Sequence, residues 1–337
     1  MEMIWNRNLF AEPALGLKCM SGCRHAIAFG LILCGTTQAF AAEGGTGWYL
    51  LGSKTGMAGY LPPPGLFVQS LNYYYSGSAR GNFDFGGITL SGGIDADAFV
   101  TLPTALWVAD QSILGGNFAL SVTTPIGWKD VRAGAALTGP GGATLSKNIE
   151  DEDFNFGDPV LGATLGWHDG NFNWTVGTLV NVPIGFWEKG NASNIGFNHW
   201  GVDANAAFTW LDPKLGAELS AAAGLTFNFE NPDTNYTTGT EFHAEFAATK
   251  IVSQQFSFGL AGYYYNQLTG DSGQGANLGD FKGHVIGLGP ALNYTIMAGQ
   301  IPISTNLKYF HEFDVQNRLS GDAGFFVVTM PLYVAGH

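Results

Sequence analysis

The residues best suited to chemistry lie close together in the second half of the chain. Glu241, His243 and Glu245 are spaced two apart, and Tyr263 and Tyr265 repeat that spacing 20 residues later. Side chains two apart on a strand share a face, and neighbouring strands would bring the tyrosines near the carboxylates. Aromatic faces with a few polar tips suit a small phenolic solute. In a simpler interpretation, His243 hydrogen-bonds a carboxylate and the tyrosines belong to an interfacial girdle.

An enzymatic interpretation needs more than these residues. A barrel hydrolase of lipid carries Ser or His beside a base on its lipid-facing side, whereas His243 has the parity expected to face inward. No Gly-x-Ser-x-Gly elbow occurs after residue 41, and no Cys-rich, paired-His or phosphate-loop pattern is present. We therefore expect no catalytic residues and no cofactor.

Two long arms show which elements position these residues. Residues 200–211 and 215–229 place apolar side chains on one parity and small or polar ones on the other, around a turn at Asp212-Pro213-Lys214. Strands of soluble proteins average about five or six residues, whereas a tilted strand that crosses a bilayer needs about 9 to 11. A soluble sandwich or propeller can also alternate, but the length and the terminal Trp residues favour a membrane strand.

The same pattern along the chain predicts an all-β fold, an antiparallel transmembrane β-barrel of about 12 strands of the outer-membrane type. The predicted strands are 66–75, 94–106, 117–126, 160–167, 171–182, 200–211, 215–229, 241–251, 256–268, 283–295, 301–313 and 325–332. Short and long connections alternate, as periplasmic turns and outer loops do. The two polar stretches between the first four strands, 76–93 and 127–157, are predicted to be loops.

The second of these predicted loops contains an acidic run, Glu150, Asp151, Glu152 and Asp153. Such a run could bind a divalent cation between lipopolysaccharide phosphates, and it is also what a plain solvated loop contains. Both interpretations stay open from the sequence.

If the apolar parity faces lipid, the opposite parity faces the lumen. A charged residue on the lipid face near the midplane costs about 2–4 kcal/mol if basic and less if acidic, so membrane physics alone predicts inward charges. The candidate substrate-binding residues of the lumen are Asp203, Glu218, Glu241, His243, Glu245, Tyr263, Tyr265, Gln267, Lys308 and Glu312, and the same rule places Asp95 and Asp97 inward.

The N-terminus predicts export. Arg24 and His25 precede an apolar run, and Ala39-Phe40-Ala41 matches a signal-peptidase site, so residues 1–41 are predicted to be a signal peptide. All three cysteines, Cys19, Cys23 and Cys34, lie before this site, which excludes disulfides and thiol chemistry from the rest of the chain. Residues 42–65 are predicted to be a Gly/Pro-rich periplasmic leader or plug-like segment, 66–332 the barrel and 333–337 a tail.

Composition agrees with a barrel and excludes other classes. Hydrophobic residues make up 46% of the chain and charged residues 12%, with 49 Gly and 25 Phe, and no later apolar run is long enough for a membrane helix. The net charge is −13, and residues 1–41 carry three basic and two acidic residues, so removing them makes the balance one unit more negative. So acidic a chain is a poor partner for nucleic acid.

Several segments together resemble one family, the outer-membrane proteins named for the meta-pathway of phenol degradation. In the first half the matching residues are Leu61-Pro62-Pro63-Pro64-Gly65, Gly157-Asp158-Pro159, Leu165-Gly166-Trp167, Asn198-His199-Trp200 and Thr209-Trp210-Leu211-Asp212-Pro213-Lys214. In the second half they are Asn231-Pro232, Tyr236, Phe242-His243, Gly262-Tyr263-Tyr264-Tyr265-Asn266-Gln267-Leu268, Asp271-Ser272-Gly273, Gly289-Pro290 and Asn317-Arg318. The usual Pro-Thr-Gly of the family is Pro183-Ile184-Gly185 here, and the chain continues to His337 rather than stopping on an aromatic residue.

The resemblance implies an outer-membrane protein of a Gram-negative bacterium that takes up hydrophobic compounds, such as phenols, for a degradation pathway. A barrel of about 12 strands should enclose a narrow lumen, which favours selective passage over a general porin. The alternative is a structural or anchoring barrel without solute flux. The expected partners are outer-membrane lipid and lipopolysaccharide, the barrel-assembly machinery and a small hydrophobic or aromatic solute, with no nucleic acid.

Overall fold

The computed structural model describes residues 42–85, 88–138, 144–276 and 282–335, which all belong to one compact unit, Ala39–His337. The predicted signal peptide lies outside the described residues. No helix in the described ranges is long and apolar enough to cross a membrane.

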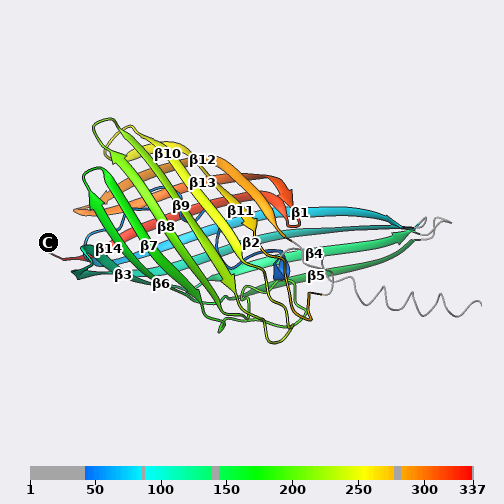
Figure 1. The fold of residues 1–337 in the computed structure, drawn as a ribbon. Helices are drawn as coiled ribbons and strands as arrows, with labels where there is room; N and C mark the ends of the chain where they lie inside the picture. Colours follow the sequence, from blue (N-terminus) through cyan, green and yellow to red (C-terminus); the bar gives the residue numbers. More distant parts are fainter. Residues whose placement is uncertain (1–41, 86–87, 139–143, 277–281, 336–337) are drawn as a thin grey trace, which may run out of the picture. The chain divides into compact units, whose positions relative to one another are not determined.

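Within these described ranges, the regular structure consists of strands apart from one 3-10 turn, η1 (Glu43–Gly45) (Figure 1). They are β1 (Gly65–Phe85), β2 (Ile88–Ile113), β3 (Gly116–Thr123), β4 (Ile126–Thr138), β5 (Thr144–Phe156), β6 (Val160–Asp169), β7 (Phe172–Asn181), β8 (Gly201–Asp212), β9 (Ala217–Asn228), β10 (Glu241–Ile251), β11 (Phe256–Gln267), β12 (His284–Ala298), β13 (Ile301–Gln316) and β14 (Ser320–Val334).

The strands close into a ring of 12 antiparallel strands, as the sequence predicted. The ring runs from β1 through β14 down to β6, then through β3 and β2 back to β1. The two strands outside the ring are β4 and β5. β4 continues from β3 after Thr124 and Pro125, and β5 leads into β6 after 157–159. Closure leaves no unpaired strand edge within the ring, which matters because lipid offers no hydrogen bonds to a free edge.

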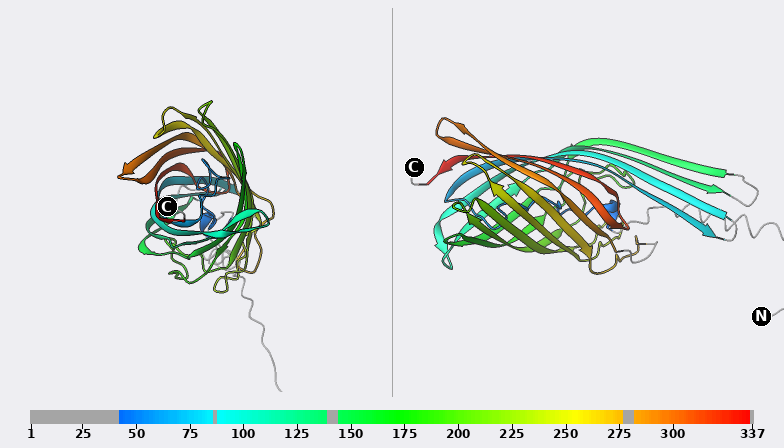
Figure 2. Two further views of the ribbon diagram at one scale, coloured as in Figure 1. Left: turned by 90° about the vertical axis from the view of Figure 1, so that its left-hand side faces the viewer. Right: turned by 90° about the horizontal axis from the view of Figure 1, so that it is seen from above.

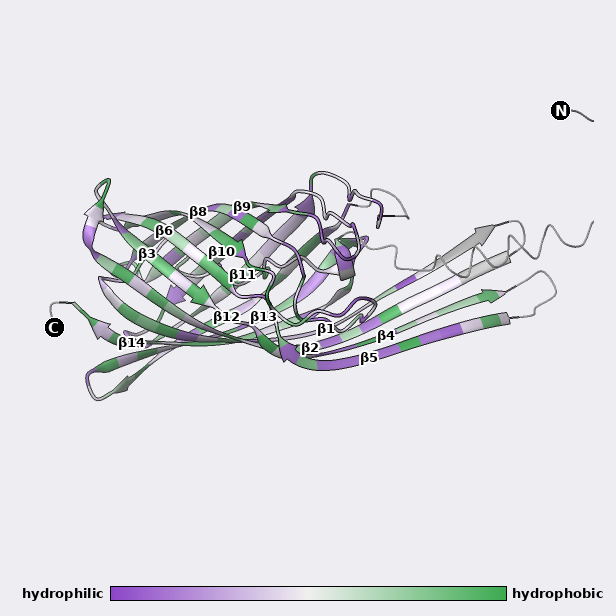
Figure 3. Ribbon diagram, turned by 90° about the horizontal axis from the view of Figure 1, so that it is seen from below, coloured by the Kyte–Doolittle hydropathy of each residue, from purple (hydrophilic) through white to green (hydrophobic). Residues whose placement is uncertain are grey.

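Alternation along the ring separates a lipid face from a lumen face. In β8, Phe208 is exposed whereas Asp203 and Thr209 are buried, and the same alternation continues through β9 and β10. Hydrophobic and hydrophilic residues alternate along the strands of the ring (Figure 3), and large apolar side chains such as Phe246 and Leu260 are exposed. The predicted period-two pattern from Trp200 to Ile251 is therefore confirmed, with strand ends within two residues of the predicted ones.

Four strands continue beyond the rim of the ring, where the sequence had predicted two loops. The far ends of β1 and β2 pair with each other, β4 pairs with β2 along 89–101, and β5 pairs with β4 over its whole length. Figure 2 shows this ribbon extending past the ring. The prediction of loops at 76–93 and 127–157 was wrong because alternation of apolar and polar residues is required only where one face meets lipid.

A row of aromatic side chains marks the level at which the ribbon leaves the lipid. Tyr74, Phe99, Trp128 and Phe154 are direct neighbours across β1, β2, β4 and β5, and they share the outward face. Aromatic rows of this kind lie at the membrane interface. Two residues further along, about 7 Å away, the next outward row contains acids, Asp97, Asp130 and Glu152.

The position of Asp97 in that row corrects the inward assignment of Asp95 and Asp97. Both have the parity of Phe99 and Trp107, which are exposed, and Asp95 forms an ion pair with Arg80 on the outer face. The inward residues of β2 beside them, Ile94, Ala96, Ala98 and Leu102, are instead apolar and belong to or pack against one buried hydrophobic cluster.

The acidic run also lies in strand β5 and not in a loop. Glu150 and Glu152 face outward near Arg132 and Trp128, whereas the Asp151 carboxylate accepts a hydrogen bond from the Ala192 backbone N–H. No group of three or more His, Cys, Asp or Glu residues suited to a metal occurs among the described residues.

The rim beside β5 is organised by one buried carboxylate. Asp158, only 2% exposed, accepts hydrogen bonds from the backbone N–H groups of Gly185, Phe197 and Asn198 and from the Asn181 amide. The long connection between β7 and β8 is thereby fixed against the break between β5 and β6.

We expect D158A to release this connection, because four donors lose a charged acceptor and each such bond contributes about 1.5–3 kcal/mol. Limited proteolysis should cut within 186–198 much faster in D158A than in the native chain. D169N, a change in the exposed turn at the opposite end, is the control. Equal cleavage rates in D158A and the native chain would contradict this role.

Candidate functional site

The lumen of the ring contains the N-terminal segment, residues 42–64. Seen along the barrel axis, this segment lies inside the ring of strands (Figure 2, left). It forms no strand, and Pro62 to Pro64 could not donate to a sheet ladder. We call residues 42–64 the plug.

The plug binds a polar wall formed by β8, β9 and β10. The Glu245 carboxylate accepts hydrogen bonds from the Tyr49 hydroxyl and the Lys54 backbone N–H, both at 2.7 Å. The Glu218 carboxylate accepts one from the Met57 N–H at 2.7 Å, and the Thr209 hydroxyl accepts one from the Gly59 N–H at 2.9 Å. The inward carboxylates thus satisfy backbone donors that the plug cannot satisfy within itself.

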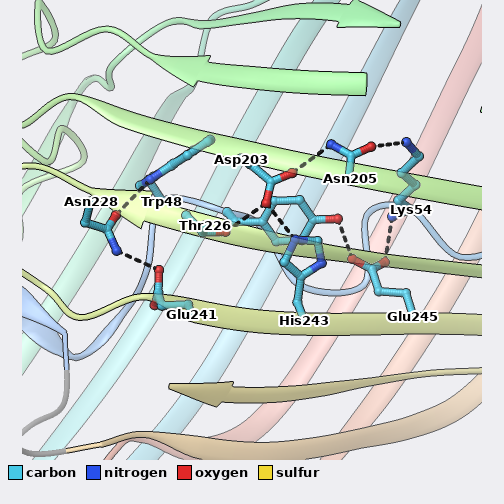
Figure 4. A network of polar contacts seen from close by, with 10 residues as sticks. Trp48, Lys54, Asp203, Asn205, Thr226, Asn228, Glu241, His243 and Glu245 are labelled. Carbon is cyan, nitrogen blue, oxygen red and sulfur yellow. Dashed lines mark hydrogen bonds and ion pairs between the residues drawn. The ribbon is translucent and has the colours of Figure 1, made fainter. Parts of the chain in front are cut away.

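His243 sits at the centre of this wall (Figure 4). Its Nε2 lies 2.8 Å from the Asp203 carboxylate, although β9 separates their strands. Gly224 of β9 makes the contact possible, because a Cβ there would lie 2.4 Å from His243 Nε2. The Tyr49 ring of the plug stacks on the imidazole with centroids 3.6 Å apart. Asn205 connects Asp203 to the Lys54 ammonium.

The opposite side of the lumen is aromatic. Tyr263 reaches from β11 over Gly287 of β12 to donate to the Glu312 carboxylate of β13, and Tyr75 of β1 donates to the same group. Phe310 and Phe325 pack edge to face beside Tyr263 and are nearly inaccessible to solvent. These rings belong to one buried apolar cluster, against which Leu50 and Leu51 of the plug also pack.

Lys308 connects the aromatic side to the plug. Its ammonium donates to the Gly52 carbonyl at 2.6 Å and to the Thr55 hydroxyl, and it lies 4.9 Å from the centre of the Phe325 ring. The plug is therefore held from both sides, by carboxylates on β9 and β10 and by an ammonium on β13.

The start of the plug is bound near the outer loops. The Ala42 N–H donates to the Asp271 carboxylate and the Glu43 N–H to the Thr238 hydroxyl, while the Asn231 amide donates to the Glu43 carboxylate. Burial raises the pKa of Glu43 above its ordinary value of 4.5, and the nearby Asp271 charge adds to this. Burial also lowers the pKa of Lys54, against the opposing effect of the Glu245 and Asp203 charges.

All ten candidate residues face the lumen and are at most 5% exposed. Pairing is as the spacing predicted, since His243 lies opposite Tyr265 and Glu245 opposite Tyr263. The tyrosine hydroxyls, however, do not bond to the residues directly opposite them. Tyr265 donates to Glu241, and Tyr263 donates to Glu312. The Gln267 amide donates to the Asp271 carboxylate at the outer end. Their role in binding a substrate stays a prediction.

Sequence reasoning missed the plug residues that cover this set. Trp48, Tyr49 and Lys54 belong to a segment without periodicity, so no pattern signalled their position. Asn205 and Thr209 could have been predicted as site residues, because they share the inward parity of Asp203. They were not singled out because they are small and uncharged. Arg318, whose guanidinium lies over the Tyr265 ring, was noted only as part of the Asn317-Arg318 motif.

The closed antiparallel ring with a lipid-facing exterior and a filled polar and aromatic lumen defines an outer-membrane β-barrel. The family model described as "Putative MetA-pathway of phenol degradation" matches residues 78–327, so the chain belongs to this family.

Solved structures resemble the fold. The COG4313 outer membrane channel from Pseudomonas putida F1 has a TM-score of 0.62 and 15% identity, covering 84% of this chain and 99% of that one. A FadL homologue from Pseudomonas aeruginosa has a TM-score of 0.41 and 11% identity, covering 86% of this chain and 98% of that one. No curated protein matches the sequence.

We expect E245A to loosen the plug, because the Tyr49 hydroxyl and the Lys54 N–H both lose their acceptor. Two bonds to a charged group contribute a few kcal/mol, so protection of the 49–55 amides from hydrogen exchange should fall about tenfold or more. L219A, on the lipid face of β9, is the matched control. Unchanged protection in E245A would show that this contact does not hold the plug.

The raised pKa of Glu43 predicts a pH dependence of docking. A carboxyl with a higher pKa when docked than when free stabilises docking fully below about pH 4.5, and this contribution is lost as the pH rises through the docked value. Protection factors of the 43–48 amides should therefore fall with rising pH above 4.5. The E43Q variant should show a flatter profile, and identical profiles in the two proteins would refute the assignment.

Proposed function

We propose that the protein passes small hydrophobic or aromatic compounds, such as phenols, across the outer membrane to supply a degradation pathway. The observation that carries this proposal is the composition of the lumen, where one wall is aromatic and the filling is a plug of the same chain. General porins of 16 to 18 strands enclose open water, whereas this ring of 12 is narrow and filled.

The aromatic wall suits such solutes in two ways. Tyr75, Tyr263, Phe310 and Phe325 present ring surfaces that would pack against a small aromatic ring. The tyrosine hydroxyls and Glu312 supply the few polar groups that orient a phenol. In this proposal, the candidate residues of β8 to β10 act indirectly, because they hold the plug whose movement opens the path.

The plug is suited to movement because it is held by hydrogen bonds with side chains of the wall rather than by a strand ladder. Each contact is weak enough to exchange singly, and the polar wall it leaves behind would be satisfied by water. A solute that packs against the aromatic wall would displace Leu50 and Leu51 from the same cluster.

A structural or anchoring barrel without flux is the second candidate. The observation that favours it is the extent of the plug contacts, which reach both walls and leave the lumen filled. This candidate predicts that no solute changes any property of the pore.

We also propose a location and partners for the protein. The mature protein lies in the outer membrane of a Gram-negative bacterium after cleavage of a signal peptide and insertion by the barrel-assembly machinery. The aromatic row of Tyr74, Phe99, Trp128 and Phe154 contacts lipid, and the ribbon beyond it contacts lipopolysaccharide.

Planar-bilayer conductance of the refolded chain, with and without phenol, tests the proposal. We expect a small steady conductance that phenol reduces, and we expect Y263F to shift the phenol concentration needed, because Tyr263 loses its bond to Glu312. L219A should behave as the native chain. A silent pore, or a conductance that phenol leaves unchanged in all three proteins, would favour the structural barrel.

A further inference from the structure

Among the residues that the structure describes, Arg318 is a cationic group of the lumen without a hydrogen bond or an ion pair. Arg318 belongs to the turn between β13 and β14 at the outer end of the barrel, and its guanidinium lies 4.6 Å from the centre of the Tyr265 ring. Among the described residues it forms no hydrogen bond and has no carboxylate within 4 Å, and its buried Nε is unsatisfied. Arg318 as a whole is half-buried, but a buried donor of a charged group that lacks an acceptor is costly, so such a group normally has a ligand or a counter-ion.

Glu241 and Glu312, two acids that interact electrostatically with Arg318, are committed to other donors. Glu241 accepts hydrogen bonds from the Tyr265 hydroxyl at 2.5 Å and from the Asn228 amide at 3.0 Å. Glu312 accepts from Tyr75, from Tyr263 and from the Gly321 backbone N–H. Both carboxylates attract Arg318 electrostatically but form no ion pair with it within 4 Å, so its donors stay unused among the described residues.

The turn that carries Arg318 is fixed and directs it inward. Asn317 has a φ of 51°, and its amide donates to the Lys282 carbonyl of the neighbouring loop. The next residue, Leu319, is buried in the aromatic cluster, and the Gly321 N–H is tied to Glu312. The guanidinium is therefore held at the outer end of the aromatic wall, where a solute from outside would first meet it.

We propose that Arg318 binds the carboxylate of a small aromatic acid, so that benzoate-like anions are among the solutes of this barrel. This inference rests on the proposed function and names a substrate class for it. A guanidinium matches a carboxylate with two parallel hydrogen bonds, which a neutral phenol cannot accept. The ring of the acid would then lie toward Tyr75 and Tyr263, which Arg318 already influences electrostatically.

Isothermal titration of the refolded full chain with benzoate and with benzyl alcohol, its neutral analogue, tests this assignment. We expect benzoate to bind more tightly than benzyl alcohol, and we expect R318Q to weaken benzoate about tenfold or more while leaving benzyl alcohol unchanged. R318K should give an intermediate loss, because the charge remains and the planar fork is lost. R80Q, which removes an arginine from the outer face, is the matched control.

Benzoate binding R318Q as tightly as the native chain, or binding no tighter than benzyl alcohol, would overturn the assignment. A shift of gel mobility on heating shows whether R318Q has folded. If R318Q has not folded, the affinity of R318K for benzoate and the comparison of benzoate with benzyl alcohol on the native chain test the assignment instead. A conductance that responds to phenol in a protein that does not bind benzoate would refute only the role of Arg318. A conductance indifferent to phenol would refute the proposed function itself.

Discussion

The constraint on which the rest of the structure depends is that every backbone N–H and C=O group at membrane depth must find a partner within the protein. The ring of 12 strands meets it by closing β1 onto β2. Closure in turn forces one face of each strand toward lipid and the other toward the lumen. Charged side chains have only the inner face available, which explains why the polar residues from Asp203 to Glu245 gather there.

A lumen rich in carboxylates creates a second demand, because buried acids need donors. The plug supplies them through backbone N–H groups and through Tyr49, and Lys308 reciprocates by binding the Gly52 carbonyl. The plug and the polar wall therefore satisfy each other's hydrogen-bonding groups. Leu50 and Leu51, in contrast, only pack against the aromatic wall. This asymmetry makes the aromatic side the place where a hydrophobic solute can compete with the plug.

The predictions from sequence succeeded where lipid dictates the pattern. Strands such as Glu241–Ile251 and the inward direction of His243 followed from period two and the cost of charge in lipid. The predictions failed beyond the aromatic row, where apolar and polar residues of the ribbon alternate only weakly. They also failed at Asp97, which faces outward because the inward face of β2 is apolar. The contacts of His243 with Asp203 and of Tyr263 with Glu312 were not predictable, because each crosses an intervening strand at a glycine. The plug has no periodicity at all.

The most direct test of this account is a disulfide between the plug and the wall. A Cβ at Gly56 would lie 3.9 Å from that of Ala247, which fits a disulfide, and the described residues contain no cysteine. We predict that oxidised G56C/A247C abolishes the phenol-sensitive conductance and that reduction restores it. Equal conductance and equal phenol sensitivity before and after reduction would contradict the claim that movement of the plug controls passage.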